Sequence, residues 1–210
     1  MTGDISPQTT ARAHVYSFLA KAFSYPDQQV VEELKRALPF ISQSVPEIDQ
    51  KANLLQAVEA LRQAFECCEW QQLRQEYSQL FTGQKQYKLN EVDYEKASGA
   101  ISQRLADISA FYLAFGLQVA PGTGERLDFI GTEADFLQAL LLKRCHAEQQ
   151  GWAEQADICA KAEAKFLKEH VLLWMPMLAQ KLMKHKGFYG ALGTLLLAFL
   201  KREQIHCEDQ

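Results

Sequence analysis

The sequence predicts an all-α protein built as a single helical bundle. Apolar residues recur at spacings of three and four from Ala11 to Leu200, which is the period of helices that bury one face. No segment shows the alternation of Val, Ile and Thr that is typical of strands. Because 48% of the 210 residues are apolar, the chain can bury a continuous core, and we expect residues 1–210 to form one domain.

Four helices are expected in the first part of the chain. Pro26 ends the first helix, and Asp27 can cap the second. Pro39 is expected to bend or end that second helix, and Gly83 is a suitable stop for the fourth. The expected ranges, in order, are 9–24, 27–42, a third helix with apolar residues from 54 to 65, and 66–81.

Four more helices are expected after an irregular connection at 84–94. Gly116 stops the first of them, Gly151 breaks the chain after the second, and Pro176 is expected to bend the third. A second irregular connection, at 118–124, contains one Pro and two Gly. The expected helical ranges are 102–115, 128–149, 152–184 and 188–203.

Charge and cysteine content limit the class of partner and the compartment. The chain has 22 Lys and Arg against 26 Asp and Glu, and the basic residues are scattered, so nucleic acid is not an expected partner. Five cysteines form no Cys-x-x-Cys pair, which favours a reducing compartment. The first seven residues lack the basic and apolar blocks of an export signal, so we expect a cytoplasmic protein.

The longest apolar stretch, 188–200, is shorter than the ~20 residues that span a bilayer. We therefore expect a buried core helix there and no membrane insertion.

Motifs for metal binding or catalysis are weak. Helical bundles that hold two metal ions carry a Glu-x-x-His pair on each of two helices, but here Glu203 and His206 form a single pair, which we interpret as part of a solvated tail. His170 is expected on a helix surface or at the edge of the core, and Cys67 and Cys68 point to different faces of a helix. No metal, no cofactor and no catalytic residue is predicted.

A turn with Gly122 and Gly124 is the one hint of nucleotide binding. The third glycine of a dinucleotide fingerprint is missing, because position 127 is Leu127, and no strand precedes the turn. The turn could still offer backbone N–H groups to an anion at the start of the next helix, but a plain turn and cap is the simpler interpretation.

Two polar segments interrupt the helical pattern, and the first follows a helix end. Tyr77, Leu80 and Phe81 lie on one helical face, where a core role is the simple interpretation. The loop that follows adds an acidic and aromatic cluster containing Glu91 and Tyr94.

The second polar segment opens the helix expected at 128–149. Asp128 is expected at the helix start, where capping is the simple explanation. Glu133 lies in an apolar run, where a carboxylate is costly unless it is paired with an internal group or with an arginine from elsewhere. Polar insertions of this kind favour a protein that grips another polypeptide over one that does covalent chemistry.

Several motifs also follow one another at particular spacings. Residues 77–83 match Tyr-x-x-Leu-Phe-x-Gly, residues 105–117 match Leu-Ala-Asp-Ile-x-x-Phe-Tyr-x-Ala-Phe-Gly-Leu, and residues 127–136 match Pro-Asp-His-Ile-x-x-Glu-x-x-Phe in part. Leu89, Glu91 and Tyr94 fit an intervening Pro-Leu-Tyr-Glu-x-x-Tyr-like stretch, and His170 and Trp174 fit the C-terminal half. In this order and spacing, residues 11–203 resemble the TorD/DmsD/NarJ-type redox-enzyme maturation chaperones.

The chain departs from this family at four positions. Leu127 and Phe129 stand where the family has Pro and His, and Lys88 and Asn90 replace a Pro and a Tyr. Phe129 can neither titrate nor donate a hydrogen bond, so we expect the details of peptide binding to differ here.

The resemblance implies an all-helical, non-enzymatic chaperone. It implies that the protein binds the apo catalytic subunit of a molybdopterin oxidoreductase, often through its twin-arginine signal peptide, until the cofactor is inserted. Arginines would pair with carboxylates while aromatic residues bury the apolar part. A monomer or homodimer is expected, and the expected binding residues are Tyr77, Leu80, Phe81, Glu91, Tyr94, Asp128, Phe129 and Glu133.

Two alternatives remain open. One is a nucleotide-binding or nucleotide-hydrolysing helical protein in which the 122–124 turn and Asp128 hold the nucleotide and Glu133 activates water. The other is an assembly chaperone for a molybdoenzyme subunit that is not exported.

Overall fold

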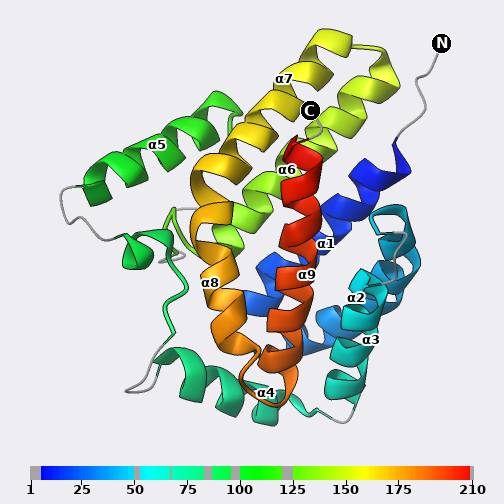
Figure 1. Ribbon diagram of the computed structural model, residues 1–210, viewed down its shortest axis with the longest axis vertical. Coiled ribbons are helices and arrows are strands. Elements are labelled where there is room, and N and C mark those ends of the chain that lie inside the picture. The colour runs from blue at the N-terminus through cyan, green and yellow to red at the C-terminus, as the bar shows by residue number, and fades with distance from the viewer. Residues whose placement is uncertain are drawn as a thin grey trace.

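The computed structural model describes residues 6–49, 53–66, 68–82, 87–95, 100–119 and 125–208. Within these ranges the chain forms helices and no strand, apart from one isolated antiparallel bridge between Asn90 and Phe129, so the all-α prediction is confirmed. Figure 1 shows the helices packed as a bundle, with α9 near its centre. None of the described helices combines the length and apolar character that a bilayer crossing requires.

The N-terminal helices form one side of the bundle. Helix α1 (Pro7–Phe23) begins at Ser6, whose Oγ accepts the N–H of Thr9 at 3.3 Å, and it packs against α2 (Gln28–Ser44) and α6 (Ile130–Gln150). As predicted, Asp27 caps α2, because its carboxylate accepts the N–H of Val30 at 2.8 Å. A short 3₁₀ turn, η1 (Val45–Glu47), leads toward α3 (Asn53–Glu66), which packs against α9 (Phe188–Glu208).

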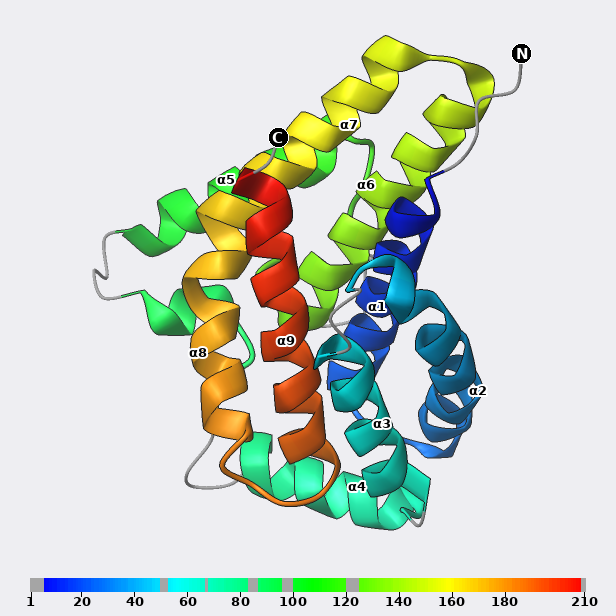
Figure 2. The same cartoon turned by 45° about the vertical axis from the view of Figure 1, so that its right-hand side comes forward.

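One end of the bundle is closed by α4 (Trp70–Tyr77), which crosses it near the start of α9 in Figures 1 and 2. It continues as a π-helix, η2 (Ser78–Thr82). The carboxylate of Glu76 accepts the N–H groups of Phe188 and Tyr189 at 3.2 and 2.8 Å, which satisfies two donors at the start of α9. This contact ties α4 to α9.

The C-terminal half contains the helices that pack around α9 from the other side. Helix α6 ends at Gly151, in the left-handed conformation (φ +71°), and pairs with α7 (Ala153–Phe166). A π-helix, η5 (Leu167–Val171), joins α7 to α8 (Leu172–Leu182), which packs closely on α9. A Cβ at Gly193 would lie 2.7 Å from that of Leu182, so a glycine is needed at this approach. The predicted core helix at 188–200 is confirmed, because most of its apolar residues are buried within α9.

Helix α5 (Ile101–Ala114) lies on the outside of the bundle in both views. Its inner face contributes Ile108 and Tyr112 to the core, and Gly116 follows with a φ of +68°. A 3₁₀ turn, η3 (Glu91–Tyr94), precedes it.

Several predicted boundaries are wrong. Helix α4 begins at Trp70 instead of Glu66 because the N–H of Glu69 bonds to the Gln72 side chain at 3.1 Å. Helix α2 continues past Pro39, so of the two outcomes expected there, a bend or an end, only the bend stays a prediction. The single helix expected at 152–184 is interrupted by the π-helix at Leu167–Val171, and Pro176, where a bend was expected, lies within α8. Gly83, expected to stop the fourth helix, and Cys67 lie outside the described residues.

A buried ion cluster joins the first and last helices, and it overturns the solvated-tail interpretation of Glu203. This residue is fully buried in α9, which extends to Glu208 instead of ending at 203. Its carboxylate accepts from Arg12 Nε and Nη2 at 2.6 and 2.5 Å and from the hydroxyl of Tyr16 at 2.6 Å. Arg12 also pairs with Glu163 of α7. The predicted tail is therefore part of a charged cluster between α1, α7 and α9.

Candidate functional site

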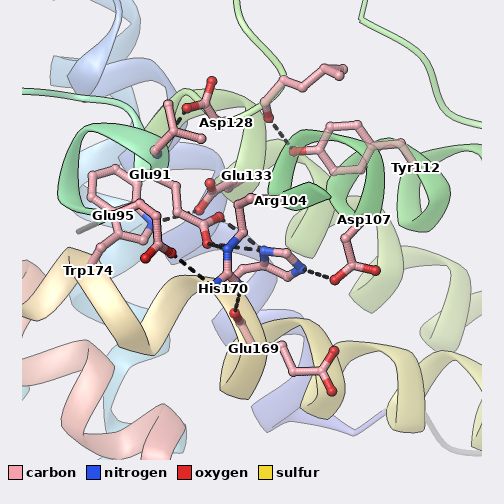
Figure 3. Close-up of polar contacts among 12 residues, drawn as sticks. Glu91, Glu95, Arg104, Asp107, Tyr112, Asp128, Glu133, Glu169, His170 and Trp174 are labelled. Carbon is pink, nitrogen blue, oxygen red and sulfur yellow. Dashed lines mark hydrogen bonds and ion pairs between the residues drawn. The ribbon is translucent and has the colours of Figure 1, made fainter. Parts of the chain in front are cut away.

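The two polar segments meet at the start of α6. The N–H of Glu91 donates to the carbonyl of Asp128, and the N–H of Ile130 donates to the carbonyl of Leu89, both at 2.9 Å. These two bonds form the bridge between Asn90 and Phe129. Residues distant in sequence are thus joined by their backbones, which brings Glu91, Asp128 and Glu133 into one region (Figure 3).

Asp128 does not cap α6, contrary to the simple expectation. Phe129 occupies the cap position, without a capping side-chain bond, and its ring packs against the core. The fully buried carboxylate of Asp128 instead accepts the N–H of Val92 at 3.2 Å and two bonds from the Arg126 guanidinium at 2.9 and 3.0 Å. Its role in this structure is to hold the loop before α5 against the start of α6.

Glu91 and His170 form the centre of the cluster. Both are buried, and Nδ1 of His170 lies 3.0 Å from Oε2 of Glu91, while Nε2 lies 3.2 Å from Oδ2 of Asp107 on α5 (Figure 3). His170 was expected at a helix surface or core edge, but its side chain is 0% exposed. It lies four residues from both Phe166 and Trp174, which places all three on one face of a helix, and this spacing could have predicted its burial.

Arg104 of α5 completes the charged part of the cluster. Its Nε lies 3.2 Å from Oε1 of Glu91 and its Nη2 lies 3.3 Å from Oε2 of Glu95. Its Nη1 donates to the carbonyl of Glu169, within the π-helix η5, at 2.8 Å. The helix on the outside of the bundle is therefore attached to η3 and η5 by one guanidinium.

Glu133 is a fully buried carboxylate of the cluster. Oε2 accepts the indole N–H of Trp174 at 3.1 Å, whereas Oε1 is buried without a conventional donor. Burial, and next the negative charge of Glu91, raise the pKa of Glu133 well above its ordinary value. When it is protonated, Glu133 can donate a hydrogen bond to Glu91.

Tyr94 covers one side of Trp174. The two ring centroids are 5.2 Å apart, the hydroxyl of Tyr94 donates to the carbonyl of Lys88 at 3.0 Å, and the ammonium of Lys181 lies 4.7 Å from the Tyr94 ring. Burial raises the pKa of Tyr94 to about 12. This residue links the loop before α5 to α8.

Tyr77, Leu80 and Phe81 lie in a different part of the fold. Tyr77 and Phe81 pack edge to face with each other and with Tyr189 of α9, at centroid distances from 4.9 to 5.9 Å. Leu80 is buried in the same core, and its carbonyl accepts the N–H of Tyr87. These three residues stabilise the junction of α4, η2 and α9, and their predicted role in binding stays a prediction.

An apolar groove begins beside the cluster and runs between α5 and α7. Its cavity of about 500 Å³ starts at Asp107, the residue that contacts His170. It continues, through the shared residues Phe115 and Ile158, into a second cavity of about 480 Å³ on α6 and α7. Both volumes are in the range of ligand sites. The apolar lining residues include Ala110, Ala114, Phe115, Ile158 and Ala162, then Leu142 and Trp152. Sequence periodicity did not predict this groove, because it depends on how α5 is placed.

The predictions on metal and nucleotide binding are not tested by the described ranges. No set of three or more His, Cys, Asp and Glu side chains is arranged there to hold a metal ion, and the prediction of a metal-free protein stays a prediction. The Gly122–Gly124 turn lies outside the described residues.

The fold and the site together define an all-helical protein with a buried acidic cluster beside an apolar groove. The sequence model of the family described as the nitrate reductase delta subunit matches residues 48–180. This is more than half of the chain, so the chain belongs to that family, which confirms the resemblance seen in the motifs.

Curated relatives carry the name Chaperone protein TorD. Those from Vibrio cholerae and Vibrio parahaemolyticus are 29% identical over 99 residues and 28% identical over 116 residues. These alignments cover 46% and 54% of this chain and 43% and 53% of the relatives. The relative from Vibrio vulnificus is 31% identical over 94 residues, which is 44% of this chain and 42% of the relative. The chain thus spans about half the length of the curated relatives it matches.

Proposed function

We propose that this protein is a non-enzymatic maturation chaperone. It binds the apo catalytic subunit of a molybdopterin oxidoreductase through a leader peptide with paired arginines, and it holds that subunit until the cofactor is inserted. Membership of the family and the chaperone name of the curated relatives support the general role.

The single observation that carries the proposal is the position of Asp107. Its carboxylate contacts His170 in the acidic cluster, and the same residue lines the start of the apolar groove. A leader peptide with arginines followed by apolar residues has a charged part and then an apolar part, in the same order as the acidic cluster and the apolar groove. It could therefore place its charges at the cluster and its apolar part along α5 and α7.

The acidic end would recognise the arginines. Glu91 and Glu95 already bind a guanidinium, that of Arg104. Charge-assisted bonds of this kind fix the register of a peptide more strongly than neutral bonds. Asp128 and Glu133 act behind them, because both are fully buried and bonded within the chain. Tyr94 packs on Trp174, which bonds to Glu133, and Phe129 follows Asp128 in the chain, so we assign these two aromatic residues the contact with the leader next to its arginines.

The groove would take the apolar segment. Ile158 is 50% exposed and Trp152 is also 50% exposed, which leaves apolar surface uncovered in the free protein. Burying such surface stabilises a complex by roughly 25 cal/mol per Å² before the cost of ordering the peptide. The aromatic residues at 77–81 are already covered, so the groove is the better place for this segment.

The proposal is tested by titration calorimetry with a synthetic peptide in which two adjacent arginines precede an apolar stretch. Ile158→Glu, which puts a charge in the groove, should weaken binding strongly. Leu113→Glu is the matched control, because Leu113 is an exposed apolar residue of α5 that does not line the groove. A second peptide with citrulline in place of both arginines should also bind weakly.

Two results would count against the proposal. Equal loss in Ile158→Glu and Leu113→Glu would remove the groove from the site. Binding of a catalytic subunit that lacks any leader, with no binding of either peptide, would favour the assembly chaperone for a subunit that is not exported.

A further inference from the structure

Arg104 occupies a position shaped for a guanidinium. Each of its three guanidinium nitrogens faces a different acceptor. Nε faces Glu91, Nη2 faces Glu95, and Nη1 donates to the carbonyl of Glu169. Arginine is the side chain whose planar fork suits such a set of acceptors. The acceptors come from η3, the residue after it and η5, whereas the guanidinium comes from α5 (Figure 3).

Two of the three acceptors, Glu91 and the carbonyl of Glu169, are held in place without Arg104. Glu91 is fixed by His170 at 3.0 Å and by its backbone bond to Asp128. The carbonyl of Glu169 belongs to a π-helix that is continuous with α7 and α8. Removing the Arg104 side chain would therefore leave the position open and largely preformed.

Helix α5 can also stay attached without this guanidinium. Its C-terminal half is held by Tyr112, which is 3% exposed, packs on Phe136 and Phe166, and donates its hydroxyl hydrogen to the carbonyl of Leu127 at 2.8 Å. The side chain of Arg104 is 24% exposed and reaches solvent. Its partner Glu91 is buried, so losing the guanidinium without a replacement would be costly, whereas exchanging it for the guanidinium of a leader keeps Glu91 paired.

We propose that Arg104 is an internal competitor for the client's arginine. It fills the guanidinium position in the free protein and yields it when an arginine of the leader arrives with its apolar segment in the groove. The inference rests on the proposed function. Such competition lowers the apparent affinity by the fraction of molecules in which the position is free. An arginine without an adjacent apolar segment would then gain too little to displace Arg104.

The test compares the wild type with Arg104→Gln, using the arginine peptide and its citrulline counterpart. We expect Arg104→Gln to bind the arginine peptide about tenfold more tightly, because the competitor is gone, and to bind the citrulline peptide as the wild type does. Adding Glu91→Gln to Arg104→Gln should abolish the gain. Circular dichroism and the thermal midpoint of each variant show that it is folded.

Arg126→Gln is the matched control. It removes one positive charge from the same region and also uncovers a carboxylate, that of Asp128, but it leaves the position of Arg104 filled. An equal gain in both variants would show a general charge effect and would overturn the inference. Unchanged or weaker binding by Arg104→Gln, with a wild type that binds, would overturn it as well and leave the proposed function standing. No binding by any of these proteins would overturn both.

Discussion

Nδ1 of His170 lies 3.0 Å from Oε2 of Glu91, although the two residues are 79 positions apart. The contact joins the loop before α5 to the π-helix between α7 and α8, and both side chains are buried. A π-helix shifts the register of a helix and is frequent at functional sites. Here it places His170 against Glu91 of the acidic loop, and it places the carbonyl of Glu169 where it accepts from Arg104.

Glu91→Gln should weaken binding of the arginine peptide by about 1–3 kcal/mol, because a charge-assisted bond is replaced by a neutral one. Added salt should weaken binding to the wild type more than to the variant. Calorimetry at two salt concentrations measures both effects. Glu59→Gln, on the exposed face of α3, is the control and should bind as the wild type does. Equal affinity of Glu91→Gln and the wild type would place the arginines elsewhere.

Tyr94→Ala should weaken binding with little change in its salt dependence. The substitution removes an aromatic surface next to Trp174 and does not remove a charge. Tyr94→Phe keeps the ring and should retain most of the affinity. If Tyr94→Phe lost as much as Tyr94→Ala, the hydroxyl bond to Lys88 would be the important feature, and the aromatic contact would not.

Glu133→Gln should flatten the pH dependence of stability. Burial and the charge of Glu91 raise the pKa of Glu133 in the folded protein. The contribution of Glu133 to stability is therefore fully present below its pKa in the unfolded chain, about 4.3, and is lost as pH rises through its raised pKa in the folded protein. Glutamine stays neutral, can accept from Trp174 and can donate to Glu91. Urea unfolding at several pH values should show that the free energy of unfolding falls less with rising pH in the variant than in the wild type. Parallel plots of this free energy against pH for the two proteins would contradict a raised pKa of Glu133.

Arg12→Met should destabilise the fold by about 3–5 kcal/mol, because it leaves the buried carboxylate of Glu203 without its cation and leaves Glu163 with only Arg144, at 3.9 Å. Urea unfolding measures the change. Arg62→Met, which breaks an exposed pair with Glu59, should change stability little. A similar small effect for Arg12→Met would mean that the cluster around Glu203 relaxes without cost.

The periodicity of apolar residues predicted the helical fold, and the order and spacing of the motifs predicted the family, because both depend on local sequence. The sequence also identified the two polar segments that meet in the structure. The sequence interpretation was wrong for Asp128. A position at a helix start favours a capping role, but in the structure the contacts of Asp128 with Val92 and Arg126 determine its role. The interpretation was wrong for Glu203 for the same kind of reason, because the compensating Arg12 is 191 positions away.

The aromatic stripe of Tyr77 and Phe81 shows a further limit of sequence patterns. An apolar helical face can serve the core or a partner, and only packing distinguishes the two. In the structure the stripe is buried against Tyr189, whereas the open apolar surface lies on α5 and α7, around Ala110 and Ile158. The spacing of these residues alone did not indicate that they would face each other.

Photo-crosslinking of the leader peptide tests the central claim most directly. A benzophenone-bearing residue is placed in the apolar stretch of the arginine peptide, and the crosslinked segments of the wild-type protein are identified by mass spectrometry. The proposed site predicts crosslinks on α5 and α7, between residues 107 and 115 and between residues 158 and 165. Crosslinks confined to residues 77–81, or spread evenly over the surface, would contradict it.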